Sequence, residues 1–339
     1  NSLYINQLIP LPTGGETTDK SYMMDLSSLE YINNEGGNTR VRKCFSGQIS
    51  DHVKDIFEKV LKTEKDLDIE QTTGSLVYTP NNTKPFYCLN DLSTKAVKGK
   101  AGETAGYFFW ETANSYHFKS IDTLMGQDHI LRVLYNESTG QPPEPYDVKA
   151  LKMETSNKVN VKKKQEIGAK STKTFLIDPY SGVVTNQINA AEIFAKGNEV
   201  KLAGAELPAL NKAFTSDEPS KDYTYISFQL ASAGQINYGK IEEQLNKSKQ
   251  INFDVATTFN QSKMRYNQLF AAEITIVIPG DFSLHAGNSV WMDIPQTDTS
   301  QTKSCGDDVS QLDGGKYLIT DLCHYITSRD TYTKLVLIR

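Results

Sequence analysis

Cysteine is scarce in this chain of 339 residues, which carries four cysteines, none of them in a CxxC pair. This wide spacing favours free thiols in a reducing compartment over a disulfide framework. Cys323 is followed directly by His324, but neighbouring side chains on a strand point to opposite faces, so we do not expect a thiol–imidazole pair. The four cysteines are Cys44, Cys88, Cys305 and Cys323.

Long apolar runs and an excess of basic charge are missing as well. No segment approaches the roughly 18 consecutive apolar residues that a membrane helix needs, so we expect no insertion into a membrane. Lys and Arg number 36 against 41 Asp and Glu, which gives a formal charge of −5. Because duplex binding is driven by basic surface, this balance argues against a protein that grips nucleic acid. It is compatible with a protein that nucleic acid slides past.

Familiar catalytic and cofactor signatures are also absent. The sequence contains no HExxH zinc helix, no GxxxxGK[ST] phosphate loop and no GxSxG nucleophile turn. Its five histidines never recur at a metal-binding spacing. We therefore expect no cofactor and no metal, and the pattern fits a structural or assembly protein better than an enzyme.

What is present predicts a β-rich α+β chain. At about one domain per 150 residues, the length predicts two or three domains. Apolar residues at helical spacing and aromatic strands indicate a small α+β unit over residues 46–125, whose first helix has Ser50 as its expected N-cap. The elements expected in this unit are helices over 49–61 and 85–97 and a hairpin of strands 106–112 and 116–120.

Strand-like segments flank this unit on both sides. At the N-terminal end, strands are expected over 3–9, ended by Pro10, and over 21–32. Towards the C-terminus, short strands separated by turn signals predict a barrel or sandwich. The expected elements are strands 174–177 and 223–230, a helix over 254–273, strands 274–278 and 289–294, and a hairpin of 316–327 with 331–338.

The C-terminal segment carries the pattern F-x-L-x-x-G-x-x-V over Phe282–Val290, followed by a closing hairpin that contains Tyr317 and His324. Together with the order of the preceding units, this pattern resembles the baseplate hub proteins of contractile-tailed bacteriophages. The similarity is to the T-even-like type, which includes phages that infect cyanobacteria. It extends over about residues 1–130 and 255–339.

The resemblance implies two tube-type β-barrel domains with a small α+β domain inserted. The first barrel would be represented only by its end, residues 1–45, so we expect its upstream part to lie outside this sequence. The α+β domain would occupy 46–129. The second barrel would occupy 130–339, with an insertion at about 176–253.

The resemblance also implies a function. Such a hub is a structural homotrimer that joins the hexameric tail tube, or its initiator, to the trimeric cell-puncturing spike. It contacts other baseplate proteins, and DNA passes through its channel without specific binding. The protein would be made in the host cytoplasm, reside in the virion tail and not be an enzyme. The hub motif assigns interface roles to Phe282, Leu284, Gly287, Val290, Tyr317, Ile319 and His324.

Two alternative interpretations remain open. The first is a tail-associated cell-wall hydrolase whose catalytic part is the 46–125 unit, because Glu111, His117 and Asp122 lie near one hairpin in the sequence. The second is the hub of a related contractile injection system, which shares the C-terminal pattern.

Overall fold

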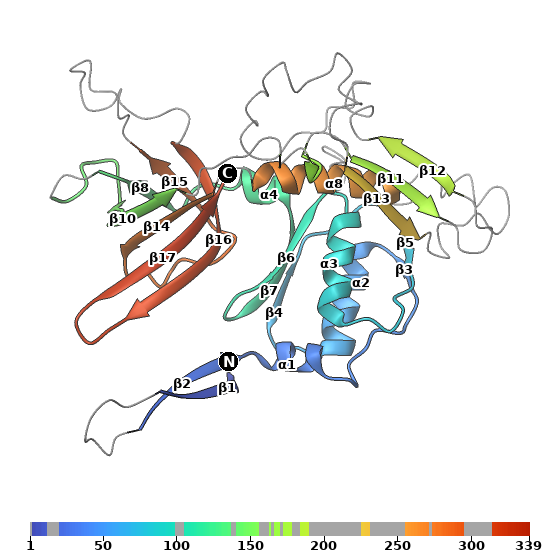
Figure 1. Ribbon diagram of the computed structural model, residues 1–339, viewed down its shortest axis with the longest axis horizontal. Coiled ribbons are helices and arrows are strands. Elements are labelled where there is room, and N and C mark those ends of the chain that lie inside the picture. The colour runs from blue at the N-terminus through green and yellow to red at the C-terminus, as the bar shows by residue number, and fades with distance from the viewer. Residues whose placement is uncertain are drawn as a thin grey trace, which may run out of the picture.

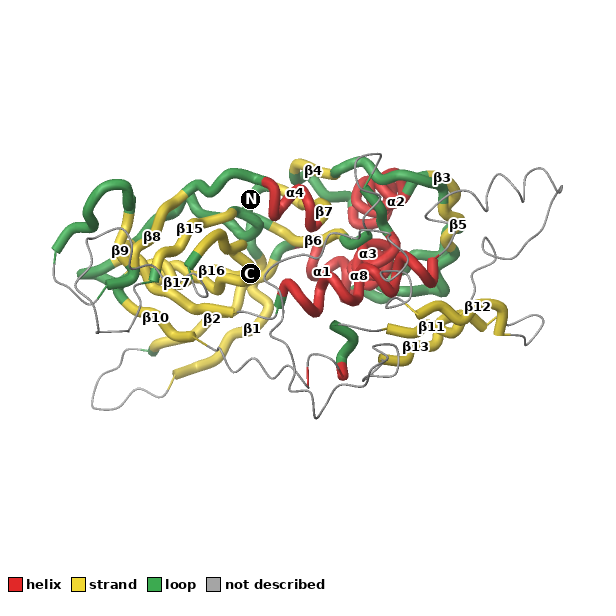
Figure 2. Tube along the Cα trace, turned by 90° about the horizontal axis from the view of Figure 1, so that it is seen from above, coloured by secondary structure: helices red, strands yellow, loops and turns green. Residues whose placement is uncertain are grey.

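The computed structural model confirms the predicted α+β, β-rich class (Figure 1). One end is built from strands and loops, and the helices lie from the middle to the other end together with further strands (Figure 2). The structure describes residues 2–11, 20–98, 105–136, 140–155, 163, 166–169, 172–177, 184–189, 225–230, 255–270, 273–294 and 314–339.

The N-terminal segment forms a two-stranded antiparallel hairpin of β1 (Tyr4–Leu11) and β2 (Ser21–Ser27). The first predicted strand is confirmed, but it continues through Pro10, because a strand that pairs on one side only tolerates a residue without an N–H. The second strand was predicted too long. It ends at Ser27, and α1 (Leu29–Glu35) follows, with the Ser28 hydroxyl accepting a hydrogen bond from the Tyr31 backbone N–H.

The α+β unit contains both predicted helices and the predicted hairpin. Its first helix is α2 (Ile49–Asp55), which continues as the π-helical segment η1 (Ile56–Leu61). The N-cap is Gln48, not the predicted Ser50, which lies buried in the first turn. The remaining elements are α3 (Pro85–Lys95), the strand pair β3 (Phe45–Gly47) and β5 (Leu76–Tyr78), and a three-stranded sheet of β4 (Asp66–Ile69), β7 (Ser115–Ser120) and β6 (Tyr107–Glu111).

An aromatic core joins the helices of this unit to its sheet. The Phe57 ring lies 4.7 Å from the Tyr116 ring and 5.7 Å from the Phe109 ring, measured between centroids. Phe57 and Tyr116 are fully buried. This packing fixes β7 on the helices and so determines which of its side chains face away from them.

The C-terminal strands form one curled sheet with the order β10-β14-β17-β16-β15-β8-β9. Its two outer strands are consecutive in the chain: the Ala150 N–H donates to the Leu134 carbonyl at 2.9 Å, and the Leu151 N–H donates to the Val277 carbonyl at 2.7 Å. One segment, residues 148–155, thus supplies both outer strands, and the sheet curls around an apolar core. The strands are β8 (Leu131–Leu134), β9 (Val148–Lys149), β10 (Lys152–Thr155), β14 (Glu273–Pro279), β15 (Ser289–Asp293), β16 (Gly315–Ile326) and β17 (Thr331–Ile338).

Two helices pack between the α+β unit and the curled sheet: α4 (Ile121–Gly126) and α8 (Val255–Leu269). The fully buried Arg265 on α8 holds Asp122 on α4 through two hydrogen bonds of 2.7 and 3.2 Å. A further sheet, β12 (Val184–Asn189), β11 (Thr172–Ile177) and β13 (Tyr225–Leu230), confirms both strands predicted in this region.

Candidate functional site

The β1–β2 hairpin exposes apolar side chains along both strands. We call residues 3–11 and 21–27 the apolar hairpin. Folded proteins rarely leave a contiguous apolar patch of this kind uncovered, and such patches mark interaction surfaces. Within the described part of the chain, no third strand pairs with β1 or β2. The exposed side chains are Leu3, Tyr4, Ile5, Leu8, Leu11, Tyr22, Met23, Met24 and Leu26, each 43 to 61% accessible to solvent.

Six of the seven residues assigned by the hub motif fall into two groups. One group is buried in the curled sheet, where its side chains form the core: Leu284, Val290, Tyr317 and Ile319. The other group reaches the surface. Phe282 is 56% exposed, and its ring lies 4.9 Å from the half-buried ring of His324. Phe282 and His324 are therefore the members whose side chains remain accessible to a partner.

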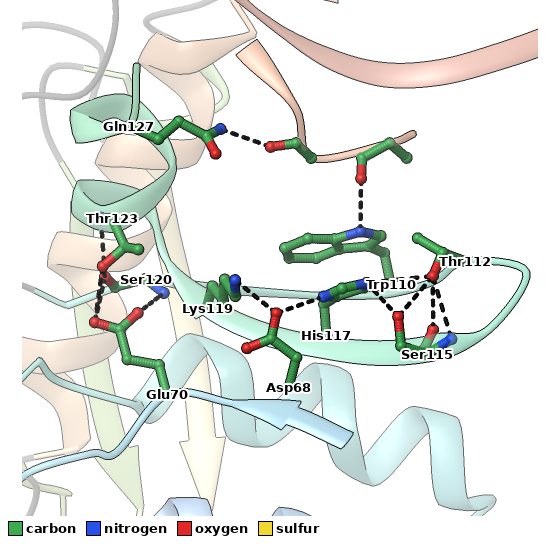
Figure 3. Close-up of polar contacts among 12 residues, drawn as sticks. Asp68, Glu70, Trp110, Thr112, Ser115, His117, Lys119, Ser120, Thr123 and Gln127 are labelled. Atoms are coloured by element: carbon green, nitrogen blue, oxygen red, sulfur yellow. Dashed lines mark hydrogen bonds and ion pairs between the residues drawn. The ribbon is translucent and has the colours of Figure 1, made fainter. Parts of the chain in front are cut away.

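Gly287, the remaining member of the motif, lies where the curled sheet meets the α+β unit. Its φ of +89° belongs to the left-handed region, and a Cβ added there would lie 2.5 Å from the Trp110 ring. The Trp110 indole N–H donates to the Ala286 carbonyl at 2.9 Å, and the Gln127 amide donates to the Gly287 carbonyl at 2.6 Å (Figure 3). This glycine thus permits close docking of the two units.

The structure does not bring together the three residues of the hydrolase alternative. Glu111 lies opposite Tyr116 in the β6–β7 register, one position beyond the Trp110–His117 pair, so Glu111 and His117 lie on opposite faces of the sheet. Glu111 is bound by the Lys65 ammonium and the Ser28 hydroxyl. Asp122 is held by Arg265. No shared acid–base centre results.

Glu111 lines a cavity of about 730 Å³ between the two units. The start of the apolar hairpin contributes Leu3, and the curled sheet contributes Phe282 and His324. The cavity therefore connects the apolar hairpin to both exposed residues of the hub motif.

A polar cluster that the sequence did not reveal lies on the other face of the β6–β7 hairpin (Figure 3). The parallel register of β4 and β7 places Asp68 opposite His117, and Asp68 Oδ2 lies 2.9 Å from His117 Nδ1. His117 Nε2 lies 2.9 Å from the Ser115 hydroxyl and 3.2 Å from the Thr112 hydroxyl. Ser115 and His117 share a face because they are two residues apart on one strand.

The contacts of this cluster orient the imidazole ring of His117. Partial burial raises the pKa of the Asp68 carboxyl, but hydrogen bonds from Lys119 and His117 outweigh it, so the pKa lies below its usual value. Lys119 Nζ lies 2.6 Å from Asp68 Oδ2. A carboxylate only accepts hydrogen bonds, so Nδ1 of His117 carries the proton towards Asp68. Nε2 is then the ring nitrogen that faces the Ser115 and Thr112 hydroxyls.

The imidazole of His117 is held in place by the Trp110 ring, which stacks on it at 4.8 Å with 15° between the planes. Beside it lies a cavity of about 230 Å³, lined by both strands of the β6–β7 hairpin and by the His285–Asn288 turn. The sequence signal for this cluster is weak, because a Ser-x-His pair on a strand is common and Asp68 is 49 positions from His117.

A second network stabilises the neighbouring end of β7. The Glu70 carboxylate accepts hydrogen bonds from the Ser120 backbone N–H and the Thr123 hydroxyl, both at 2.8 Å (Figure 3), and Lys98 lies 3.1 Å away. Half-burial raises the pKa of the Glu70 carboxyl, but the hydrogen bonds lower it by more. The pKa therefore lies below its usual value. Ser120 also caps α4. We interpret this network as structural, since it fixes the start of α4.

The described residues contain no group of three or more His, Cys, Asp or Glu side chains placed to hold a metal ion. Among the helices that the structure describes, none combines the length and apolar character needed to cross a membrane. Of the four cysteines, Cys44, Cys88 and Cys323 are free thiols, and Cys305 lies outside the described ranges.

Comparison with known proteins gives a likeness of fold. No protein-family model and no curated protein matches the sequence. Among solved structures, the tail protein from Neisseria meningitidis MC58 is similar over 99% of this chain and 79% of its own, with a TM-score of 0.54 and 8% identity. The 43 kDa tail protein of prophage MuSo2 from Shewanella oneidensis aligns over 99% of this chain and 75% of its own, with a TM-score of 0.49 and 6% identity.

Proposed function

We propose that this chain is a structural component of a contractile tail, a baseplate hub that assembles as a homotrimer between the tail tube and the spike. The observation that carries the proposal is the apolar hairpin. Nine large apolar side chains of the apolar hairpin stay accessible to solvent, whereas two clusters of buried apolar residues form cores elsewhere in the described part of the chain. The likeness of fold to a tail protein supports the same conclusion.

An assembly would remove the unfavourable exposure of these side chains. In a closed ring, each chain presents a surface that its neighbour covers, so an open strand pair becomes part of an interface. On this proposal, the apolar hairpin belongs to the end of a first tube-type barrel, residues 1–45, and the curled sheet is the second. Phe282 and His324 lie beside the same cavity as Leu3, which makes them the motif residues best placed to extend the contact.

The charge of the chain agrees with a conduit. At a formal charge of −5, the protein has no basic excess that would hold DNA phosphates in a channel. DNA would therefore pass without specific binding. On this proposal the protein resides in the virion tail and contacts the tube, the spike and other baseplate proteins.

The proposal is tested by measuring oligomeric state. Ile5 and Leu26 face each other across the hairpin, as do Leu8 and Met24. Each side chain is already about half covered, so burying the remainder contributes about 1 kcal/mol. Replacing all four by serine should therefore weaken assembly by roughly 4 kcal/mol, about a thousandfold in dissociation constant.

Native mass spectrometry should show a threefold mass for the unaltered chain and a monomer for the fourfold serine variant, with unchanged circular dichroism. Tyr87→Ser is the matched control, because Tyr87 is 64% exposed on α3, far from the hairpin in sequence. It should assemble like the unaltered chain. An unaltered chain that stays monomeric at every concentration and joins no tail particle would overturn the proposal.

A further inference from the structure

We propose that Ser115, His117 and Asp68 form a nucleophilic triad that hydrolyses small carboxylic esters in the cavity beside them. This activity is separate from assembly, because Ser115 and His117 line the smaller cavity and neither of them lines the cavity that meets the apolar hairpin. Its test therefore succeeds or fails independently of the oligomeric state.

The order of the contacts is the one that nucleophilic catalysis requires. The Ser115 hydroxyl lies 2.9 Å from His117 Nε2, and His117 Nδ1 lies 2.9 Å from the Asp68 carboxylate. A serine is activated when a base accepts its proton and a third group orients that base. Here the orientation is fixed twice, by Asp68 and by the stacked Trp110 ring.

The reaction balances with water as the second reactant. Ser115 Oγ bonds to the ester carbonyl carbon while its proton moves to Nε2 of His117. That proton then passes to the leaving alkoxide, which departs as an alcohol and leaves an acyl-serine. Water attacks the acyl carbon, His117 takes its proton, and the proton returns to Oγ as the carboxylic acid leaves. Ser115 and His117 touch the reacting atoms, whereas Asp68 acts through His117 as a positioning residue.

The cavity sets the substrate class. At about 230 Å³ it is smaller than usual ligand pockets, so it suits a short acyl group on an alcohol. Asn114 and Asn288 line it and carry amide N–H donors of the kind that stabilise an oxyanion. Leu124 and Ala286 supply apolar lining.

Thr112 is the rival nucleophile in this cluster. Its hydroxyl lies 3.2 Å from His117 Nε2, but it also contacts the Ser115 hydroxyl at 2.9 Å and the Ser115 backbone carbonyl at 3.1 Å. These contacts close the hairpin turn. Ser115, with the shorter distance to Nε2, is therefore assigned the nucleophilic role.

The test uses the full chain, a fluorophosphonate probe and p-nitrophenyl acetate. The probe forms a phosphorus–oxygen bond with an activated serine and releases fluoride, and peptide mass spectrometry then locates the label. We expect the label on Ser115 and ester hydrolysis that falls more than a hundredfold in Ser115→Ala and in His117→Ala. Ser283→Ala is the matched control, because the exposed Ser283 hydroxyl contacts Asp281 at 2.6 Å in an Asx-type turn. It should retain full activity.

Asp68 is tested by its effect on the pH profile. Asp68→Asn should lower hydrolysis at least tenfold and shift its dependence on pH, and Asp68→Glu should restore part of the rate. If Asp68 had only a structural role, Asp68→Asn would leave the shape of the pH profile unchanged, and Asp68→Glu would not restore the rate. Absence of label on Ser115 in the folded chain, label on Thr112, or hydrolysis unaffected by Ser115→Ala would each overturn the proposal.

Discussion

The ion pair between Arg265 and Asp122 should be the most sensitive single contact at the junction of the two units. Arg265 is 1% exposed, and its guanidinium holds the Asp122 carboxylate through two hydrogen bonds and the Ala105 carbonyl through a third. Asp122→Ala removes the counter-charge and leaves a cation buried. Loss of one partner of a buried pair typically costs 3–5 kcal/mol.

The structure places this variant at the lower end of that range. The Asp122 side chain is 25% exposed, so water already weakens the pair, and the Ala105 carbonyl remains to bind the guanidinium. We therefore expect a loss of about 3 kcal/mol in the free energy of unfolding, measured by urea denaturation with circular dichroism. Glu58→Ala is the control, since the exposed Lys54–Glu58 pair at 3.7 Å should contribute about 0.5 kcal/mol or less.

A second variant separates charge burial from packing. Arg265→Met combined with Asp122→Leu removes both charges and keeps apolar volume, so it should recover most of the loss. If Asp122→Ala costs less than about 1 kcal/mol, the buried cation is satisfied in another way and the reasoning is refuted.

Two further predictions concern the junction and the helical core. Gly287→Ala should lower the free energy of unfolding by about 1–3 kcal/mol in urea, because a Cβ there meets the Trp110 ring and φ is positive, whereas Gly126→Ala, with open space around it, should have little effect. Burial lowers the pKa of His52 to about 4, below its unfolded value near 6.5, so the unfolded chain binds this proton more tightly. The part of the free energy of unfolding that depends on neutral His52 should therefore be fully present above about pH 6.5 and be lost as the pH drops towards 4. His52→Phe should flatten that part of a urea-denaturation series, and an unchanged slope would contradict the assignment.

Local periodicity was sufficient for the elements that carry their own pattern. Apolar residues at helical spacing predicted the helices now seen as α2 with η1 and as α3, and aromatic alternation predicted the β6–β7 hairpin. Element ends were less predictable. Ser50 satisfies the usual N-cap preference, yet its backbone N–H donates to the Thr72 hydroxyl, and that tertiary contact lies outside any local rule.

By itself, the sequence determined the β-rich α+β class and the positions of most strands, because side-chain alternation records which face of each element is buried. Only the tertiary structure decided which strands become neighbours. The pairing of β4 with β7 brought Asp68 to His117, and the segment 148–155 joined the two edges of the curled sheet. The fold also buried Leu284 and Val290 while leaving Phe282 and the apolar hairpin exposed. Contacts between distant segments depend on the packing of whole elements, so no single stretch of sequence encodes them.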